Sequence, residues 1–248
     1  MGKKTERADL VVVRQGLAAT QDLAGRLIMA GQVFQLGPGG RTLVDKPGRL
    51  LPREAVLELK EGGRFVSRGG YKLFSALEHF GLDVTGLVAL DAGASTGGFT
   101  DCLLQCGAAR VYAVDVGHGQ LHWKLVTDPR VINLERVNLR LAGPDLLPEQ
   151  VDLIVADCSF ISLRLILPPC LALLKDKGLI VALVKPQFEL DPKYAVKGVV
   201  HCQEARLRAV EDIGLFARET LGLTVHGYVP AGIKGPKGNQ EYLLYLSR

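Results

Sequence analysis

Apolar runs alternate with helical stretches along most of the chain, from about residue 84 to its end. The runs have the length and the Val, Ile and Leu content of buried strands, and two of the segments between them, 98–107 and 203–221, have helical spacing. Seven strands with intervening helices predict an α/β fold with an open, mostly parallel, three-layer sheet. The predicted strands are residues 87–90, 111–114, 131–134, 151–156, 179–184, 224–229 and 242–246.

The first 60 residues have a different pattern. Apolar residues recur at helical spacing over 10–17 and over 23–28, and Thr20 precedes the second group as a candidate N-cap. We expect a small α+β domain here, ending near the polar glycine pair within residues 60–63. Its strand candidates, separated by Gly- and Pro-rich turns, are residues 33–34, 43–44 and 55–59.

The composition excludes several classes of protein. Of the 248 residues, 48% are hydrophobic and 23% are charged, as in folded globular proteins. No stretch approaches the roughly 20 uninterrupted apolar residues of a membrane-spanning helix, so we expect no membrane partner. The start, Met1-Gly2-Lys3-Lys4, is followed by polar residues unlike a secretory signal, which favours a cytoplasmic location. The five cysteines include no C-x-x-C pair, and we expect neither disulfides nor a metal site.

The excess positive charge lies at the front of the chain. Residues 1–72 hold 13 Lys or Arg against 7 Asp or Glu, whereas the rest of the chain is slightly acidic. Such a surplus is typical of a surface that binds a polyanion, because Lys and Arg release counterions from a phosphate backbone. A solvated basic surface is the alternative, and charge by itself does not separate the two.

A glycine-rich turn follows the first predicted strand of the larger domain. The stretch 90–100 reads L-D-A-G-A-S-T-G-G-F-T, and ligands of α/β sheets bind at such strand ends. A dinucleotide site would have G-x-G-x-x-G, but the middle position is Ser95. Asp91 at the strand end suits an ammonium group better than a pyrophosphate, and Asp115, after the next strand, suits ribose hydroxyls. These features favour S-adenosylmethionine over NAD; the alternative is that both carboxylates only cap helices.

Three ionisable residues lie at ends of later strands. Asp157 follows the fourth strand, Lys185 follows the fifth, and Glu241 precedes the last. Lys185 closes a very apolar run, so burial should lower its pKa, and a second cation such as Lys72 would lower it further. A lysine of this kind can act as a base. Taken singly, each residue is more simply read as structural or solvated.

Six ordered motifs resemble the hemolysin-A-like (TlyA) family, which shares the FtsJ-type ribose 2′-O-methyltransferase domain. The front segment, with R-A-D-L-V-V-V at 7–13 and A-G-Q-V-F at 30–34, resembles more weakly a small RNA-binding module first described in a ribosomal protein. The motifs are S-R-G-G-Y-K-L at 67–73, D-A-G-A-S-T-G-G-F-T at 91–100, V-D-V-G-H-G-Q-L at 114–121, D-C-S-F-I-S-L at 157–163, V-K-P-Q-F-E at 184–189 and G-N-Q-E-Y-L at 238–243.

The resemblance implies a Rossmann-like class I methyltransferase that uses S-adenosylmethionine to methylate ribose in ribosomal RNA, either free or in ribosomal subunits. It implies a catalytic set of Lys72, Asp157, Lys185 and Glu241. The cofactor would be surrounded by Asp91, Gly93, Ser95, Gly97, Gly98, Phe99 and Asp115, with Glu135 and Asn138 near the adenine.

The resemblance also implies an organisation into three segments: an RNA-binding domain over 1–60, a linker and leading helix that carries Lys72 over 61–83, and the methyltransferase domain over 84–248. The front domain would hold RNA by shape and phosphate contact. One departure is visible at 197–202, where the family usually has an arginine-aspartate pair after the valines, and this puts the substrate contacts of that loop in doubt. The expected RNA contacts are Arg7, Arg14, Arg26 and Arg68.

We expect Lys185 to accept the ribose proton or to steady the alkoxide, Asp157 to orient it, and Glu241 to hold Lys72 or the ribose. Two other functions stay open. An RNA cytosine-C5 methyltransferase would attack the base through Cys158. An RNA-binding assembly factor would bind without turnover. A membrane-active protein is disfavoured by the absence of a spanning segment, and amine methylation by the absence of prolines after Asp157.

Overall fold

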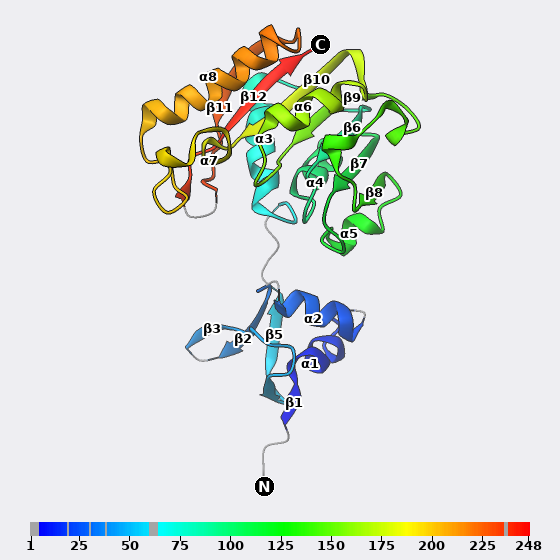
Figure 1. Cartoon of the computed structure of the whole chain (residues 1–248). Helices are drawn as coiled ribbons and strands as arrows, with labels where there is room; N and C mark the ends of the chain where they lie inside the picture. The colour runs from blue at the N-terminus through cyan, green and yellow to red at the C-terminus, as the bar shows by residue number, and fades with distance from the viewer. Residues whose placement is uncertain (1–4, 19, 30, 38, 60–63, 236–237) are drawn as a thin grey trace. The chain divides into compact units, whose positions relative to one another are not determined.

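The structure is a computed structural model that describes residues 5–18, 20–29, 31–37, 39–59, 64–235 and 238–248 (Figure 1). The chain divides into two compact units, residues 1–64 and 65–248. The segment 60–63, where the sequence places the end of the first domain, lies outside the described residues. The helix that carries Lys72 belongs to the second unit.

The first unit is a small α+β domain, as the sequence predicts. Helices α1 (Ala8–Arg14) and α2 (Gln21–Met29) contribute half of the buried residues of an apolar core, and strands and connecting segments contribute the rest. Thr20 accepts a hydrogen bond from the backbone N–H of Leu23 at 3.2 Å, as expected of an N-cap. The strands are β1 (Thr5–Arg7), which pairs with β4 (Leu50–Pro52), and β2 (Val33–Gly37), which lies between β3 (Gly40–Leu43) and β5 (Val56–Leu59).

The second unit contains the predicted seven-stranded sheet, in the order β11-β12-β10-β9-β6-β7-β8. The five strands from β10 to β8 are parallel, and β12 runs antiparallel to both β10 and β11. The mostly parallel α/β fold is therefore confirmed. The strands are β6 (Val88–Ala92), β7 (Arg110–Asp115), β8 (Val131–Glu135), β9 (Val151–Ala156), β10 (Leu174–Val184), β11 (Thr224–Pro230) and β12 (Tyr242–Ser247).

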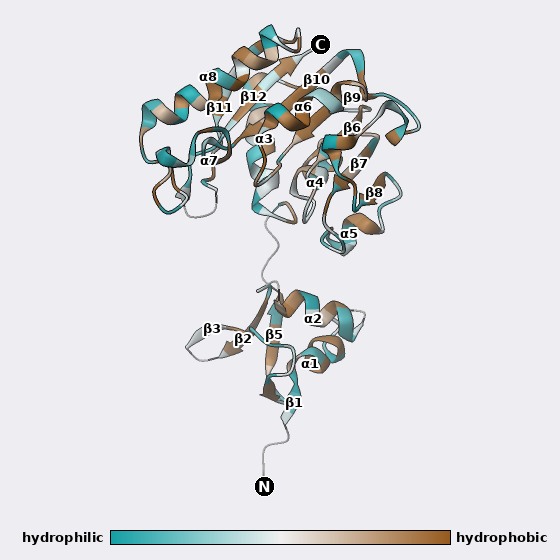
Figure 2. Ribbon diagram, viewed as in Figure 1, coloured by the Kyte–Doolittle hydropathy of each residue, from teal (hydrophilic) through white to brown (hydrophobic). Residues whose placement is uncertain are grey.

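Helices cover both faces of this sheet and form two apolar cores (Figure 1). Successive residues of a strand enter opposite cores: Leu153 packs with the helices of one face and Ile154 with those of the other. The central strands are therefore buried on both sides, and Figure 2 shows them mostly in brown. The helices are α3 (Arg68–Phe80), α4 (Gly98–Gln105) and α5 (Trp123–Val126) on one face, α6 (Leu163–Leu171) and α8 (Gln203–Glu219) on the other, and the short α7 (Pro186–Glu189).

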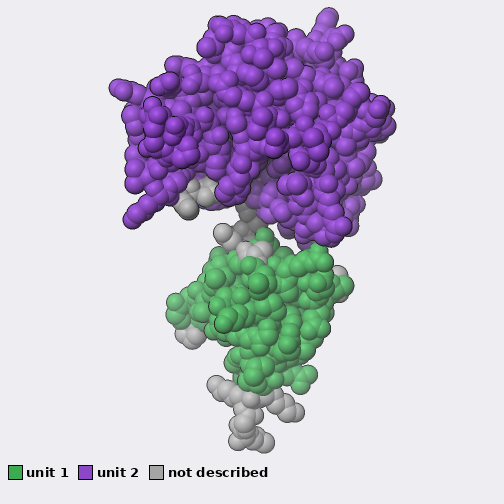
Figure 3. Space-filling model, in the orientation of Figure 1, with its two compact units in different colours: residues 1–64 green, residues 65–248 purple. Residues whose placement is uncertain are grey.

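Each unit has a core of its own, and Figure 3 shows the two units in different colours. In the second unit, β6 lies at the centre, with β7 and β8 on one side and β9 and β10 on the other. The chain order therefore reverses at β6. Open α/β sheets bind ligands outside the carboxyl ends of the strands at such a reversal.

The ring of Phe65, just before helix α3, packs against the first turns of this helix. This ring is buried and contacts the rings of Tyr71 and Phe74, with centroid distances of 5.0 Å and 5.8 Å. It packs directly on Gly70, where an added Cβ would overlap with Cβ and Cγ of Phe65. Because those atoms are close to the backbone of Phe65, the overlap cannot be relieved by a small rotation of the ring.

We expect Gly70→Ala to lower the free energy of unfolding by about 1–3 kcal/mol, the usual cost of overpacking a core. Urea unfolding of the full chain measures it. Gly214→Ala in α8 is the matched control, because a Cβ there would lie 3.8 Å from Val225, an ordinary contact. The control should be neutral or gain up to about 1 kcal/mol of helix propensity. Equal stability of the two variants would contradict the packing argument.

Candidate functional site

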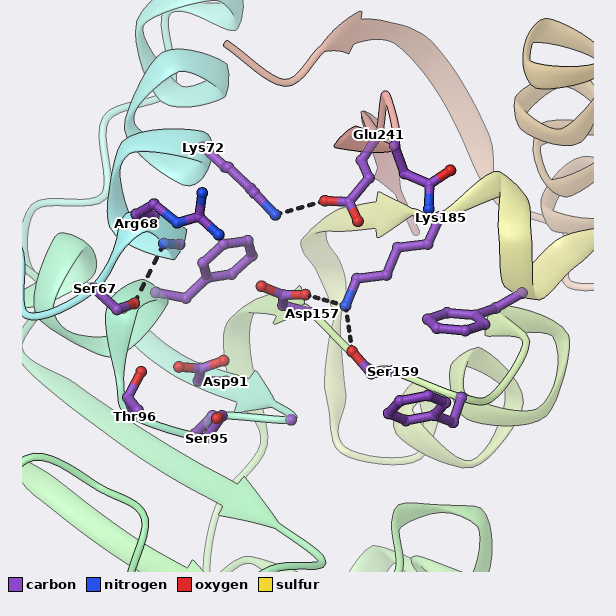
Figure 4. A pocket seen from close by; sticks show the side chains of 18 of the residues that line it. Ser67, Arg68, Lys72, Asp91, Ser95, Thr96, Asp157, Ser159, Lys185 and Glu241 are labelled. Carbon is purple, nitrogen blue, oxygen red and sulfur yellow. Dashed lines mark hydrogen bonds and ion pairs between the residues drawn. The ribbon is translucent and has the colours of Figure 1, made fainter. Parts of the chain in front are cut away.

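A cavity of about 630 Å³ lies at the carboxyl ends of β6, β9 and β10 (Figure 4). Its volume is within the range of small-molecule sites. It is lined from five directions: the start of α3, the turn after β6, the loop after β9, the segment after β10, and the segment before β12. The residues of the sheet reversal and those next to the antiparallel strand therefore face one space.

The turn between β6 and α4 is shaped by residues with a left-handed backbone. Gly93, Ser95 and Gly97 have φ values of +84°, +49° and +91°. A Cβ on Gly97 would overlap with Leu125, and a Cβ on Gly98 would overlap with the hydroxyl of Ser67, the N-cap of α3. Two of these glycines thus let helices approach closely, while Gly93 and Ser95 line the cavity.

Asp91 is a fully buried carboxylate that lines the cavity. Its Oδ2 accepts hydrogen bonds from the backbone N–H of Thr100 at 2.9 Å and from the Thr100 hydroxyl at 2.6 Å. Its Oδ1 is buried and has no hydrogen-bond partner among the described residues. Burial raises the pKa of Asp91 to about 7, against the opposing effect of the Thr100 hydrogen bonds. An ammonium group in the cavity would satisfy Oδ1 and favour the ionised form.

Two lysine–carboxylate pairs lie side by side in the cavity (Figure 4). Lys185 Nζ is 2.6 Å from Asp157 Oδ1 and donates a hydrogen bond to the Ser159 hydroxyl at 2.7 Å. Lys72 Nζ donates to Glu241 Oε2 at 2.5 Å. Both lysine side chains are less than 10% exposed, and Glu241 is fully buried. The four residues of the expected catalytic set therefore line one cavity, although they come from positions 72 to 241 of the chain.

Five of the nine expected cofactor contacts line the cavity. Asp91, Gly93, Ser95, Gly98 and Phe99 line the cavity, and Gly97, Asp115, Glu135 and Asn138 are not among the residues that line it.

Three of the residues outside the cavity have contacts of their own. Asp115 accepts the backbone N–H groups of Ser95 at 2.8 Å and Gly117 at 2.7 Å, and so holds the turn that faces the cavity. Glu135 accepts from Gly119 N–H at 2.8 Å, and Asn138 caps a short 3₁₀ helix. Asp115 thus acts next to the cavity, and the other two lie further along the same edge of the sheet.

Of the four arginines expected to contact RNA, one lines the cavity and three lie in the first unit. Arg68 is exposed and lines the cavity. In the first unit, Arg7, Arg14 and Arg26 form ion pairs with Asp9, Glu6 and Asp22 respectively. The pairs of Arg14 and Arg26 are exposed and contribute little to stability, so an approaching phosphate can replace their carboxylates. The Asp9 partner of Arg7 is buried.

Sequence reasoning missed several residues that line the cavity. Ser159 and Phe160 lie two and three residues after Asp157, and their position just after a strand end is the signal that could have found them. Phe160 is 90% exposed and has a left-handed backbone with φ +63°, and its ring lies 5.1 Å from that of Phe188. Gln187 lines the cavity with a buried Oε1 that has no partner in the described part of the chain. Asn239 also lines the cavity, and a lone asparagine has no distinctive pattern in a sequence.

Cys158, the expected nucleophile of the cytosine-C5 alternative, is not among the residues that line the cavity. Its Sγ lies 3.4 Å from the carbonyl oxygen of Ala92, and burial raises the pKa of its thiol to about 12. The reactive form of cysteine is the thiolate, so this environment disfavours nucleophilic attack.

In the residues that the structure describes, no helix has both the length and the apolar character needed to cross a membrane. The same residues include no group of three or more His, Cys, Asp or Glu side chains that could hold a metal ion.

Comparisons with known proteins relate this chain to a family. The model of the FtsJ-like methyltransferase family matches residues 65–248. A Mycobacterium tuberculosis protein named 16S/23S rRNA (cytidine-2′-O)-methyltransferase TlyA is 44% identical over 242 residues, covering 97% of this chain and 89% of the relative. Hemolysin A of Brachyspira hyodysenteriae is 35% identical over 97% of this chain and 99% of its own length. A solved structure from Streptococcus thermophilus, provisionally described as a hemolysin, is 43% identical with a TM-score of 0.74, covering 100% of this chain and 90% of that chain.

The raised pKa of Asp91 predicts a pH dependence of stability. The pKa is about 7 in the folded protein, against about 3.9 in an unfolded chain. The folded state binds more protons between these values, so the free energy of unfolding should fall as pH rises from about 4 to about 7. Asp91→Asn, which stays neutral, should remove this fall in urea unfolding followed between pH 5 and 8. Asp83→Asn is the control, because its exposed carboxylate has a lowered pKa; an Asp91→Asn curve parallel to wild type would contradict the assignment.

Proposed function

The chain belongs to the FtsJ-like methyltransferase family, and from this premise we propose that it transfers the methyl group of S-adenosylmethionine to a ribose 2′-hydroxyl of ribosomal RNA. The observation that carries the proposal is the pair of buried lysine–carboxylate contacts in one cavity at the sheet reversal. The M. tuberculosis relative is named for this reaction, which supports extending it to this chain.

The cavity suits S-adenosylmethionine. Asp91 offers a buried carboxylate oxygen without a partner in the described residues, matched to the ammonium of the methionine moiety. The turn of Gly93 and Ser95 brings backbone rather than bulky side chains to the cavity wall. Asp115 holds that turn by accepting the backbone N–H of Ser95. When bound, the cofactor supplies an activated methyl group on a sulfonium centre. Asp91, Gly93, Ser95 and Phe99 would hold it, with Asp115 available to the ribose hydroxyls.

The chain's own part in the reaction is to hold the ribose and remove one proton. Lys185 Nζ has three bonding positions, and Asp157 and Ser159 occupy two of them. The third is left for the 2′-oxygen. In the neutral amine this position is a lone pair that accepts the hydroxyl proton, and Asp157 then stabilises the ammonium that forms. Lys72, held by Glu241, places a second positive charge on the same wall of the cavity. Alignment of the two reactants supplies much of the rate.

The first unit, with its basic composition, would dock the RNA, and the cavity of the second unit would receive the target nucleotide. The substrate is ribosomal RNA, free or within a ribosomal subunit, and the protein would act in the cytoplasm, where ribosomes are. The same proposal includes RNA recognition through phosphate contacts and shape rather than base edges.

Lys185→Ala tests the reaction. We expect methyl transfer from labelled S-adenosylmethionine to ribosomal RNA to fall by about 10²- to 10⁴-fold, because the group that handles the proton is lost. Cofactor binding, measured by equilibrium dialysis, should change little. Lys177→Ala, an exposed lysine at the other end of β10, is the charge-matched control.

The product distinguishes the alternatives. A 2′-O-methyl makes the adjacent phosphodiester resistant to alkali, which a C5-methyl does not. Alkali-sensitive product would refute ribose methylation, and RNA binding with no methyl incorporation by the wild-type protein would favour an assembly factor. Full turnover in Lys185→Ala would refute the role of this lysine alone.

Phe160 provides an aromatic surface for the target base. Its exposed ring lines the cavity, and Phe160 is next in sequence to Ser159, which accepts a hydrogen bond from Lys185. Its left-handed backbone is a conformation that a bulky residue rarely adopts. Stacking of a base on an aromatic ring contributes about 1–3 kcal/mol. We expect Phe160→Ala to raise the KM for RNA by about 5- to 100-fold in the methyl-transfer assay. Phe160→Tyr keeps the ring and should stay near wild type; an unchanged KM in Phe160→Ala would exclude stacking.

A further inference from the structure

A two-residue turn forms one rim of the cavity. Val196 and Val199 exchange backbone hydrogen bonds at 2.9 Å and 3.0 Å, and the residues between them, Lys197 and Gly198, have φ values of +51° and +81°. Positive φ at both central positions defines a type I′ turn, which favours Asn, Asp and Gly. Gly198 lines the cavity. A lysine in this conformation is an outlier, and an outlier beside a functional cavity calls for a functional reason.

The buried side-chain amide of Asn239 links this turn to the segment just before β12. Asn239 is only 3% exposed. Its Nδ2 donates to the carbonyl oxygen of Gly198 at 2.8 Å, and its Oδ1 accepts the backbone N–H of Val200 at 3.0 Å. Both ends of the amide are therefore committed to the turn. Because Asn239 is two residues from Glu241, the turn is held in register with the lysine–carboxylate pairs.

The charges of the cavity leave a role for Lys197. Lys72 and Lys185 are each paired with a carboxylate, so these four side chains have no net charge to offer a phosphate. Arg68, which is exposed at the start of α3, can meet one phosphate, and a second phosphate of the same nucleotide would need a further cation. Lys197 is exposed, and among the described residues no ion pair or hydrogen bond of its side chain is found. Lys193, on the same loop, pairs instead with Asp191 at 3.4 Å. An RNA that presents a 2′-hydroxyl to Lys185 must also bring the phosphates on either side of that ribose to the rim.

We propose that Lys197 binds a phosphate flanking the target ribose, and that Asn239 is the positioning residue that holds its turn at the rim. The inference rests on the proposed function and specifies how the same site holds its substrate. A rigid turn presents the lysine with less loss of backbone freedom on binding than a flexible loop would. The contact is independent of sequence, because it is made to the backbone of the RNA.

Lys197→Gly is the decisive variant. Glycine adopts the observed φ freely, so the turn should form and the melting temperature should stay equal or rise, while the charge is lost. For filter binding of in vitro transcribed ribosomal RNA in increasing KCl, we expect the slope of log K against log salt to fall by about 0.7 to 1, the value of one phosphate contact. The KM for RNA should rise several-fold with kcat within about twofold, and Lys197→Arg should restore both.

Asn239→Ala tests the positioning role. It should lower the salt slope by the same amount although Lys197 is still present, and combining it with Lys197→Gly should lower the slope no further. Lys177→Gly, which removes an equal charge elsewhere, should leave KM unchanged. A full salt slope and an unchanged KM in Lys197→Gly would overturn the proposal, as would a fall in kcat alone. Because binding is measured without turnover, a wild-type protein that binds the RNA but does not methylate it would count against the proposed function and not against this contact.

Discussion

The site depends on the antiparallel insertion of β12 beside β10. In this register Val184 pairs with Tyr242, so Lys185, just after one strand, lies next to Glu241, just before the other. A parallel β12 would have put Glu241 at the opposite edge of the sheet. The parallel neighbour β9 ends at the same edge of the sheet, so Asp157 lies there too. Lys72 comes from α3 and donates a hydrogen bond to Glu241. The meeting of these four side chains is thus a consequence of strand direction.

Placing two lysines and two carboxylates in one largely buried site costs free energy, which ion pairing partly offsets. Removing a charge from water costs several kcal/mol, which a close partner only partly offsets. Here each lysine has a carboxylate within about 2.6 Å, and Ser159 adds a further acceptor to Lys185. No cation among the described residues pairs with Asp91, and burial raises its pKa to about 7. The cavity is therefore built with one carboxylate that lacks its counter-charge, which a cationic ligand would supply.

The rim of the cavity differs from its interior. Inside, both lysines are paired with carboxylates, and Asp91 is buried with no cation beside it among the described residues. At the rim, Phe160 is almost fully exposed, and both Phe160 and Lys197 have left-handed backbones. A stacking ring and an unpaired cation are the two kinds of group that a nucleotide needs, one for its base and one for its phosphate. Asn239, which lies outside the expected set, holds the turn that carries Lys197. Asp115, an expected cofactor contact, holds the turn of Ser95. On the proposed function, the interior of the site would carry the chemistry and the rim would recognise the substrate.

Much of the fold and part of the site followed from the sequence. Strands buried on both faces read as continuous apolar runs, and a glycine turn after the first of them predicts a ligand site whatever the rest of the chain does. The ordered motifs predicted Lys72, Asp157, Lys185 and Glu241 as one set. The ion-pair partners, the burial of Asp91, and the separation of Glu135 and Asn138 from the cavity depend on distances between residues far apart in the chain. Local pattern determines which element a residue joins, whereas strand order and direction determine which side chains meet, and only the tertiary structure decides these.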